Sequence, residues 1–244
     1  MKAYSELNGV KTYYKLSNYN TADGIIGYEC VNEIIVDRLL TILNIAHLHY
    51  QLIHADINID DRIVETWLCA SQDFKKRGES KATLEAYYQQ EKRPGESVLD
   101  FCVRNGWEQD VYQMLVVDYL ILNRDRHGAN IEVLKNNKDK AVRLAPLFDH
   151  GLSFIFSSKT DEEFKTYDVL EDKKVQCFVG SGSTKENLFL IPKDQRRNLP
   201  DFDESLREYL FRDIDGIMSE TWQETIWKML RERALEYADI CFKG

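Results

Sequence analysis

Two stretches in the middle of the chain, residues 120–131 and 144–151, limit what this sequence can fold into more than any other feature. In the first, an apolar run ends in a charged cluster that contains Asp125, and Asn130 follows before a short β-like segment. In the second, another β-like segment leads to Asp149 and a glycine. Consecutive strands joined by a short turn usually lie side by side. The order of the segments therefore predicts that the side-chain oxygens of these three residues converge.

Three converging oxygen ligands suit the transfer of a phosphoryl group from ATP. That reaction needs a carboxylate to orient or deprotonate the attacking hydroxyl, and hard oxygen ligands to hold Mg²⁺ on the phosphates. The spacing assigns Asp125 as the base, Asn130 as the first magnesium ligand and Asp149 as the second. The alternative interpretation is a solvated salt-bridge cluster followed by an ordinary turn. Because both motifs occur in this order, we favour the nucleotide site.

The motif Asp-Arg-His at residues 125–127 with Asn130, followed by Asp-His-Gly at residues 149–151, resembles the atypical kinases. It resembles the phosphoinositide kinases and, more closely, the bacterial HipA-like serine/threonine kinases, over a core of roughly residues 10–155. The resemblance implies an α+β, two-lobed protein-kinase-like fold with ATP and Mg²⁺ as cofactors. It also implies that the first Asp is catalytic and that Asn130 and Asp149 bind magnesium. His127 belongs to the catalytic loop in these families, and we expect it to play a supporting role.

The N-terminal part of the sequence predicts a small β-rich lobe over residues 1–72. Residues 10–16, 48–57 and 62–71 are rich in β-formers, whereas residues 28–43 have the apolar spacing of a helix. A kinase needs a strand lysine on the α- and β-phosphates and a helix glutamate that holds it. Lys15 and Glu33 have that order and separation. Ser71 lies in the expected connection between lobes, residues 69–73, where kinases receive adenine.

Histidines and aspartates near the first long hairpin raise the question of a metal site. They are His47, His49, His54, Asp56, Asp60 and Asp61. We interpret them as the edge of a hairpin with a solvated acidic turn, because such turns are common between strands. We therefore expect no metal ion in this region.

The remainder, residues 73–244, predicts a mainly helical second lobe. Residues 74–95 are charged and helix-prone, and residues 97–103 and 108–122 read as helices, the second nearly apolar throughout. Asp118 interrupts that apolar helix, and a buried carboxylate must be paired. We expect it to brace the catalytic loop through Arg124 or Arg126.

The last third of the chain shows no further chemistry. Residues 180–185 are glycine- and serine-rich but lack the spacing of a P-loop, and Ser183 with Glu186 instead forms a capping-box pattern that opens a helix over residues 186–190. The tail should be largely helical, with core anchors at Trp222, Ile226, Trp227, Leu230 and Leu235. Residues 152–167 follow Asp149 where kinases keep an activation loop.

Net charge, cysteine distribution and the length of apolar runs indicate which partners and which cell compartment to expect. The 244 residues carry a net charge of −9, which argues against nucleic-acid binding because that needs clustered Lys and Arg. The five scattered cysteines suggest neither disulfides nor a zinc site, and no apolar run approaches about 18 residues. We therefore expect a soluble cytoplasmic protein with a protein or small-molecule substrate and no membrane contact.

One departure from the kinase pattern leaves alternatives open. Protein kinases cover the phosphates with a glycine-rich hairpin, but Gly9 is the sole glycine before Lys15. The phosphate lid is missing, reduced to a turn around Asn8 and Gly9, or supplied by an N-terminal partner protein. A nucleotide-binding pseudokinase, a toxin–antitoxin component completed by an antitoxin-like partner, and a small-molecule or lipid kinase are therefore alternatives to a protein serine/threonine kinase.

Overall fold

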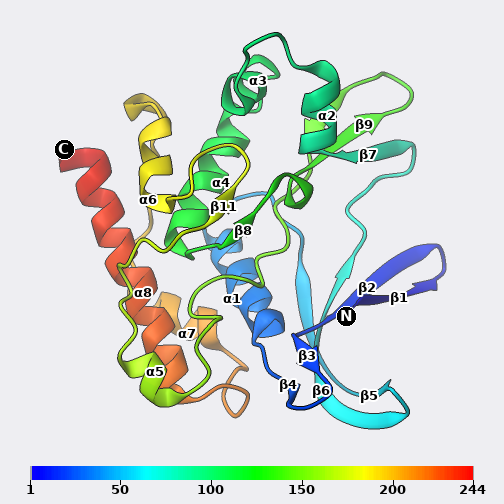
Figure 1. Cartoon of the computed structure of the whole chain (residues 1–244), viewed down its shortest axis with the longest axis vertical. Coiled ribbons are helices and arrows are strands. Elements are labelled where there is room, and N and C mark those ends of the chain that lie inside the picture. Colours follow the sequence, from blue (N-terminus) through cyan, green and yellow to red (C-terminus); the bar gives the residue numbers. More distant parts are fainter. Residues whose placement is uncertain (1, 244) are drawn as a thin grey trace.

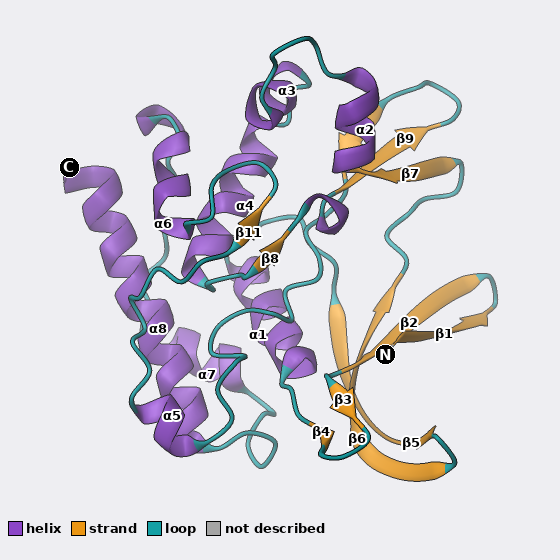
Figure 2. Cartoon of the chain, in the orientation of Figure 1, coloured by secondary structure: helices purple, strands orange, loops and turns teal. Residues whose placement is uncertain are grey.

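The computed structural model describes residues 2–243, so Met1 and Gly244, the outer ends of the two expected lobes, lie outside the described residues. The chain has a sheet-rich N-terminal part and a mainly helical remainder, as the sequence predicts (Figures 1 and 2). No helix within residues 2–243 combines the length and the apolar character that a bilayer crossing requires.

The N-terminal sheet is antiparallel and has the strand order β1-β2-β6-β5. Its strands are β1 Lys2–Leu7, β2 Val10–Leu16, β5 Tyr50–Ile59 and β6 Arg62–Gln72. The three strands expected from the sequence are confirmed, with ends shifted by up to two residues. Strand β1 was not expected. It forms because Asn8 and Gly9 have φ values of 52° and 77°, the left-handed conformation that a two-residue hairpin turn requires.

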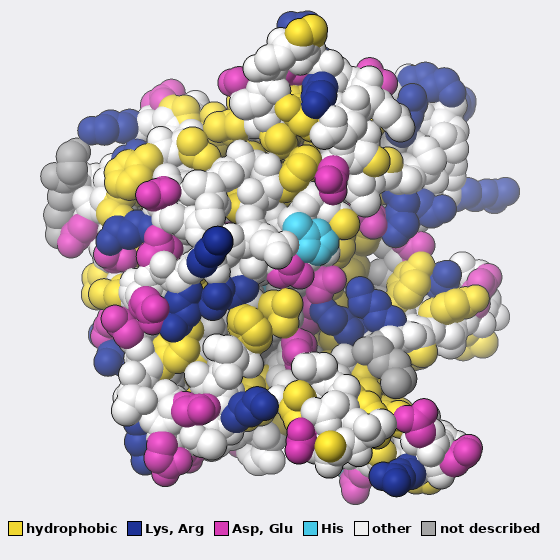
Figure 3. Space-filling view, viewed as in Figure 1, with side chains coloured by type: hydrophobic (Ala, Val, Ile, Leu, Met, Phe, Trp, Pro, Cys, Tyr) yellow, Lys and Arg dark blue, Asp and Glu magenta, His cyan; other side chains and the backbone are white. Residues whose placement is uncertain are grey.

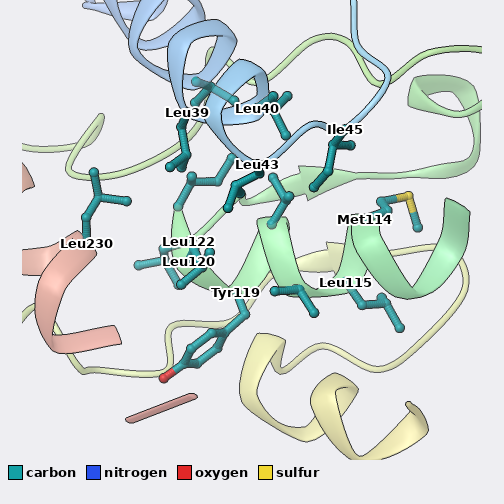
Figure 4. Packing of buried hydrophobic residues seen from close by; sticks show 14 of the residues in the cluster. Leu39, Leu40, Leu43, Ile45, Met114, Leu115, Tyr119, Leu120, Leu122 and Leu230 are labelled. Atoms are coloured by element: carbon teal, nitrogen blue, oxygen red, sulfur yellow. The ribbon is translucent and has the colours of Figure 1, made fainter. Parts of the chain in front are cut away.

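Helix α1, Glu29–Ile42, packs on this sheet and confirms the helix expected at residues 28–43. A short hairpin, β3 Tyr19–Asn20 and β4 Gly24–Ile25, precedes it. The helix is buried on more than one side, because it also packs against the helical part of the chain. Figure 4 shows Leu39, Leu40 and Leu43 from this region beside Leu120 and Leu122 in one cluster of buried side chains.

The expectation of a helical segment over residues 74–95 is wrong in its first half. Residues Glu79–Thr83 form strand β7, which pairs with β9, Glu132–Asn136; β9 pairs in turn with β10, Val142–Leu144. Pairing with an open strand edge outweighs the weak helical preference of these charged residues. Helix α2, Leu84–Glu91, starts where the Thr83 side chain accepts a hydrogen bond from the Ala86 N–H.

The helical part is built around α4, Glu108–Leu120, which is buried along most of its length. The helices that pack against it are α3 Val98–Arg104, α6 Thr184–Asn187 and α8 Glu220–Ala238, whereas α5 Asp161–Lys165 contacts α8 and α7 Glu204–Phe211 contacts α1. Ser183 caps α6 by accepting from the Glu186 N–H, which confirms one half of the capping pattern, whereas the Glu186 carboxylate accepts from the Ser181 hydroxyl instead. Helix α6 begins at Thr184, two residues before the expected start, and a 3₁₀ turn continues it over Leu188–Leu190. Four of the five predicted tail anchors are buried, but Leu235 is 64% exposed, so that prediction is wrong.

Shorter elements complete the chain. Strand β8, Asp125–Arg126, pairs in parallel with β11, Gln176–Cys177, and 3₁₀ turns cover Gly128–Asn130 and Lys193–Gln195. A π-helical segment, Asp239–Lys243, follows α8.

Candidate functional site

The loop that carries Asp125 is braced by a buried ion pair. Arg126 donates from Nε and Nη2 to the two carboxylate oxygens of Asp118, both at 2.9 Å, and both side chains are almost fully buried. This confirms the pairing expected for Asp118 and selects Arg126 as its partner; Arg124 instead donates to the Lys174 carbonyl. Burial alone would lower the pKa of Arg126, but the Asp118 carboxylate raises it above its usual value.

The same guanidinium joins the two motifs that the sequence analysis singled out. Nη1 of Arg126 donates to the carbonyl oxygen of Asn130 at 3.2 Å and to that of Phe148 at 3.1 Å. Phe148 immediately precedes Asp149. A rigid, planar guanidinium with several fixed donors can hold two backbone segments in a defined relation. Arg126 therefore fixes the segment that ends in Asn130 beside the one that leads into Asp149.

Asp125 lies in a network of short polar contacts. Its backbone N–H donates to Oδ1 of Asn123, and Asn123 donates to Asp118 at 2.9 Å, so the buried ion pair also positions Asp125. Asn130 donates from Nδ2 to the Asp125 carbonyl at 2.8 Å and to its carboxylate at 3.3 Å. Because Nδ2 is used in this way, the amide Oδ1 of Asn130 remains as the ligand atom for a cation.

His127 supports the turn of this loop. Its Nδ1 accepts a hydrogen bond from the Ala129 N–H at 3.1 Å, so in the neutral ring the proton is on Nε2. Nε2 is 3.6 Å from Oδ1 of Asp125. The ring is therefore oriented with its N–H towards the carboxylate of the predicted base.

The structure brings Lys15 of β2, Glu33 of α1 and Asp149 together. The Lys15 ammonium lies 2.9 Å from Glu33 and also pairs with Asp149, and Glu33 is completely buried. Burial would lower the pKa of Lys15, but the two carboxylates overcome this and raise it above its ordinary value. Burial would raise the pKa of Asp149, but Lys15 and, more weakly, Lys2 lower it. The lysine is therefore a cation and Asp149 an anion at neutral pH.

The backbone around Asp149 is held in an uncommon conformation. Asp149 has a φ of 58°, and its N–H donates to the hydroxyl of Tyr50 at 3.3 Å. The next N–H, of His150, donates to Glu33 at 2.9 Å. A Cβ on Gly151 would lie 2.9 Å from the Cβ of Glu29, which explains the glycine of the Asp-His-Gly motif.

A cavity of about 220 Å³ opens beside this cluster, between the N-terminal sheet and the β7–β9 region. Its lining combines aromatic side chains with basic ones: Tyr13, Tyr14, Tyr50, Phe74, Phe148, Lys2, Lys15 and Lys81, together with Ser71 and Asp149. Figure 3 shows acidic, basic and histidine side chains gathered near the middle of this face of the molecule. An aromatic wall beside several ammonium groups suits a flat base with an anionic tail.

The predicted site residues fall into two groups. Lys15, Ser71 and Asp149 line the cavity, and Glu33 holds Lys15 from behind. Asp125, Asn130 and His127 are not among the described residues that line the cavity. Their loop is joined to the cavity wall by Arg126, which donates to the backbone carbonyls of Asn130 and Phe148. Ser71 belongs to strand β6, paired with Tyr13 and Tyr50, so the expected connection at residues 69–73 is mostly strand.

Sequence reasoning missed three contributors to this site: Asn123, Tyr50 and Lys2. Asn123 is adjacent to the motif but is not part of it. Tyr50 is the first residue of β5, and Lys2 lies on the unexpected strand β1, where its ammonium is 3.5 Å from Asp149. The Asn-Gly pair at residues 8–9, directly ahead of the β-forming residues 10–16, was the available signal for a hairpin that includes β1.

The side chains present fit ATP and Mg²⁺. Asp149 and Asn130 offer carboxylate and amide oxygens, the ligands that magnesium prefers, and Asp125 offers a further carboxylate on the same loop. The lysines of the cavity offer positive charge for phosphates in a chain whose net charge is −9.

Comparison with known proteins supports a kinase-like fold. No protein-family model matches the sequence, and the search of curated proteins gives no significant match. Among solved structures, the Helicobacter pylori proinflammatory kinase CtkA aligns over 100% of this chain and 93% of its own, with a TM-score of 0.64 and 14% identity. HipA of Shewanella oneidensis MR-1, solved with HipB and operator DNA, aligns over 96% of this chain and 60% of its own, with a TM-score of 0.54 and 14% identity. At this identity the likeness establishes the fold alone, and that fold is kinase-like.

Proposed function

We propose that this chain is an ATP- and Mg²⁺-dependent phosphotransferase of the HipA-like kinase type that phosphorylates serine or threonine of a protein. The observation that carries the proposal is the Lys15–Glu33 ion pair, whose ammonium also contacts Asp149. A strand lysine held by a helix glutamate beside a metal-binding aspartate is the arrangement with which protein kinases position ATP for phosphoryl transfer. The kinase-like fold supports the same function.

The proposal gives each residue a role. Lys15 neutralises the α- and β-phosphates, and Asn130 and Asp149 hold Mg²⁺, which would neutralise charge on the phosphates. Asp125 orients or deprotonates the acceptor hydroxyl. His127 keeps Asp125 oriented, and Ser71 lies where the base of the nucleotide would enter.

Partners and compartment belong to the same proposal. A protein substrate is expected, and the complex of HipA with HipB supports an antitoxin-like partner for this chain. All five cysteines are free thiols in the described residues, which suits a reducing cytoplasm. The negative net charge argues against direct binding of nucleic acid.

A second candidate function is nucleotide binding without transfer. One observation favours it: Asp149 is paired with two ammonium groups, those of Lys15 and Lys2. If these lysines stay in place when a nucleotide binds, they take over the neutralising role of a metal ion. A small-molecule or lipid acceptor remains a further alternative to a protein.

Transfer of label from γ-labelled ATP with Mg²⁺ tests the proposal. The parent protein, incubated alone and with a cell lysate, should label a protein band. Asp125→Ala should bind ATP as the parent does but transfer about 10²–10⁴-fold more slowly, the usual contribution of a positioned base. Asp149→Ala should lose magnesium-dependent ATP binding. Asp56→Ala, which removes an exposed carboxylate of β5, is the matched control and should behave as the parent.

The outcomes separate the candidates. Turnover that persists in Asp125→Ala contradicts the assigned base, and ATP affinity unchanged in Asp149→Ala contradicts the metal assignment. ATP binding by a parent that transfers no label supports the second candidate. Label on a small molecule or lipid, with none on protein, supports the alternative acceptors.

A further inference from the structure

Two histidines that follow α1 turn back onto a carboxylate of that helix. Oδ1 of Asp37 lies 3.2 Å from Nε2 of His47 and 3.0 Å from Nδ1 of His49. The three ligand atoms are all within 4.8 Å of one another. The third histidine of this region, His54, lies elsewhere: it contacts Glu65 and stacks on Trp67. The cluster therefore combines residues 37, 47 and 49, and the aspartates near the hairpin turn have no part in it.

The hydrogen bonding of His47 places two hydrogen-bond acceptors opposite each other at the centre of the cluster. Its Nδ1 is 2.6 Å from the carbonyl oxygen of Ile45, which can only accept, so Nδ1 carries a proton. In the neutral ring Nε2 is then a bare lone pair that faces the Asp37 carboxylate. The Thr41 hydroxyl lies 3.4 Å from Nε2 but donates its proton to the Asp37 carbonyl oxygen at 2.9 Å. The two acceptors therefore need either a second proton on the ring or a cation between them. A backbone carbonyl that orients the other ring nitrogen is also the usual support of a metal-binding histidine.

The spacing of the ligand atoms suits a small divalent cation. In a tetrahedral site with zinc–ligand bonds of about 2.0–2.1 Å, neighbouring ligand atoms lie roughly 3.3 Å apart. The Asp37–His47 and Asp37–His49 distances are within about 0.3 Å of that value. Imidazole nitrogens favour zinc and related late metals over magnesium or calcium. The donor set is therefore different from the oxygen ligands of the candidate active site.

The location permits metal entry and a fourth ligand. The His47 side chain is 4% exposed and that of Asp37 is 15% exposed, whereas that of His49 is 75% exposed. Both histidines also line a cavity of about 450 Å³, which shares Leu48 and Ser71 with the lining of the nucleotide cavity. Two partly buried ligands and one at the surface leave a coordination position open to water.

We propose that Asp37, His47 and His49 form a Zn²⁺ site that fastens α1 to the start of β5. The connected segments are those that shape the nucleotide cavity. The Leu48 N–H donates to the carbonyl oxygen of Leu147, two residues before Asp149, and the Tyr50 hydroxyl accepts from the Asp149 N–H. Asp37 lies one helical turn after Glu33 on α1. A bound ion would thus hold in place the strand start and the helix face that support the Lys15–Asp149 cluster.

Zinc binding by the untagged, chelator-treated full chain tests this site. Competition with a chromophoric zinc chelator and metal analysis of the dialysed protein should give one Zn²⁺ per chain, and the thermal midpoint should rise with added ZnCl₂. His49→Ala alters an exposed side chain, so it should fold as the parent does. It should bind Zn²⁺ at least about tenfold more weakly. Removing a residue that only hydrogen-bonds to a metal ligand already lowers metal affinity by about that factor. His54→Ala, the matched control on β5, should bind as the parent does.

Co²⁺ provides a readout of geometry. Visible d–d bands of tetrahedral Co²⁺ should appear in the parent and in His54→Ala and should be absent from His49→Ala. If the parent binds no Zn²⁺, His47 is instead a protonated partner of Asp37 and the proposal is wrong. Equal zinc affinity in the parent and in His49→Ala would place the metal at other residues and would also overturn it. Zinc binding is measured without ATP, so neither result by itself contradicts the proposed phosphoryl transfer.

Discussion

The Asp118–Arg126 pair connects the predicted base, the predicted magnesium ligands and the central helix. Removing one partner of a buried ion pair leaves an uncompensated charge, which costs about 3–5 kcal/mol. Asp118→Ala should therefore lower the free energy of unfolding by about that amount, because the Arg126 guanidinium would stay buried. Urea denaturation followed by circular dichroism measures the change.

An exposed pair provides the control for that experiment. Lys228 and Glu232 lie 3.9 Å apart on the surface of α8, and such pairs contribute about 0–1 kcal/mol. Lys228→Ala should shift the unfolding free energy by no more than that. If Asp118→Ala lowers the free energy of unfolding as little as Lys228→Ala does, the buried ion pair does not stabilise the loop that carries Asp125.

At the scale of residues, the sequence was most informative where chemistry demands a particular side chain. The pairing of Asp118 was predictable, because a carboxylate in an apolar helix must find a partner. The Lys15–Glu33 pair was predicted from the order and separation that a kinase-like site needs. Tyr50 was not predictable, because a tyrosine at a strand end carries no signal of its own. Its contact with Asp149 exists only once the segment before β5 has paired with the segment before Asp149.

At the scale of elements, periodicity predicted α1, α4 and the long hairpin β5–β6, whose apolar patterns extend over ten or more residues. It did not predict β1 or β7. Both are short, charged strands whose formation depends on a partner strand distant in sequence or on one turn. The β-propensity of such segments is weak, so whether they form strands depends on pairing with the rest of the sheet.

The β1–β2 hairpin gives a prediction at this scale. Lys2 on β1 contacts Asp149, so the hairpin reaches the site where the phosphates would lie. The Gly9 φ of 77° is strongly disfavoured for a β-branched residue. Gly9→Val should open the hairpin and weaken ATP binding by up to about tenfold, since a left-handed residue costs roughly 1–2 kcal/mol. The melting temperature should change little, because β1 is exposed throughout. Titration with ATP measures the affinity.

Gly95 is the matched control for Gly9. Its φ is 75°, and among the described residues neither glycine has an atom within 4 Å of where a Cβ would stand. Gly95 lies before α3 and is not among the residues that line the cavity. Gly95→Val carries the same backbone strain and should leave ATP affinity unchanged. An equal loss in both variants would show that strain, rather than the hairpin, affects binding.

At the scale of the molecule, the largest hydrophobic cluster contains residues from both sides of the lobe boundary expected near residue 72. Val31, Ile35 and Leu39 of α1 belong to the same buried cluster as α4 and α8. The cluster specific to the N-terminal sheet is much smaller and centres on Leu16, Ile59 and Leu68. The sequence predicted each helix from its own pattern, but nothing in those patterns says which faces meet.

The shared core predicts that the chain unfolds as one unit. Leu39 is completely buried, and truncating such a side chain costs about 2–5 kcal/mol. Leu39→Ala should lower stability by that amount and shift tryptophan fluorescence and far-ultraviolet circular dichroism together in urea, because Trp222 and α1 depend on the same cluster. Leu68→Ala, in the small cluster of the sheet, should cost less. Two separate transitions in the parent, with Leu39→Ala affecting only one, would show that α1 belongs energetically to the sheet alone. In that case the Lys15–Glu33 pair would be independent of the helical core.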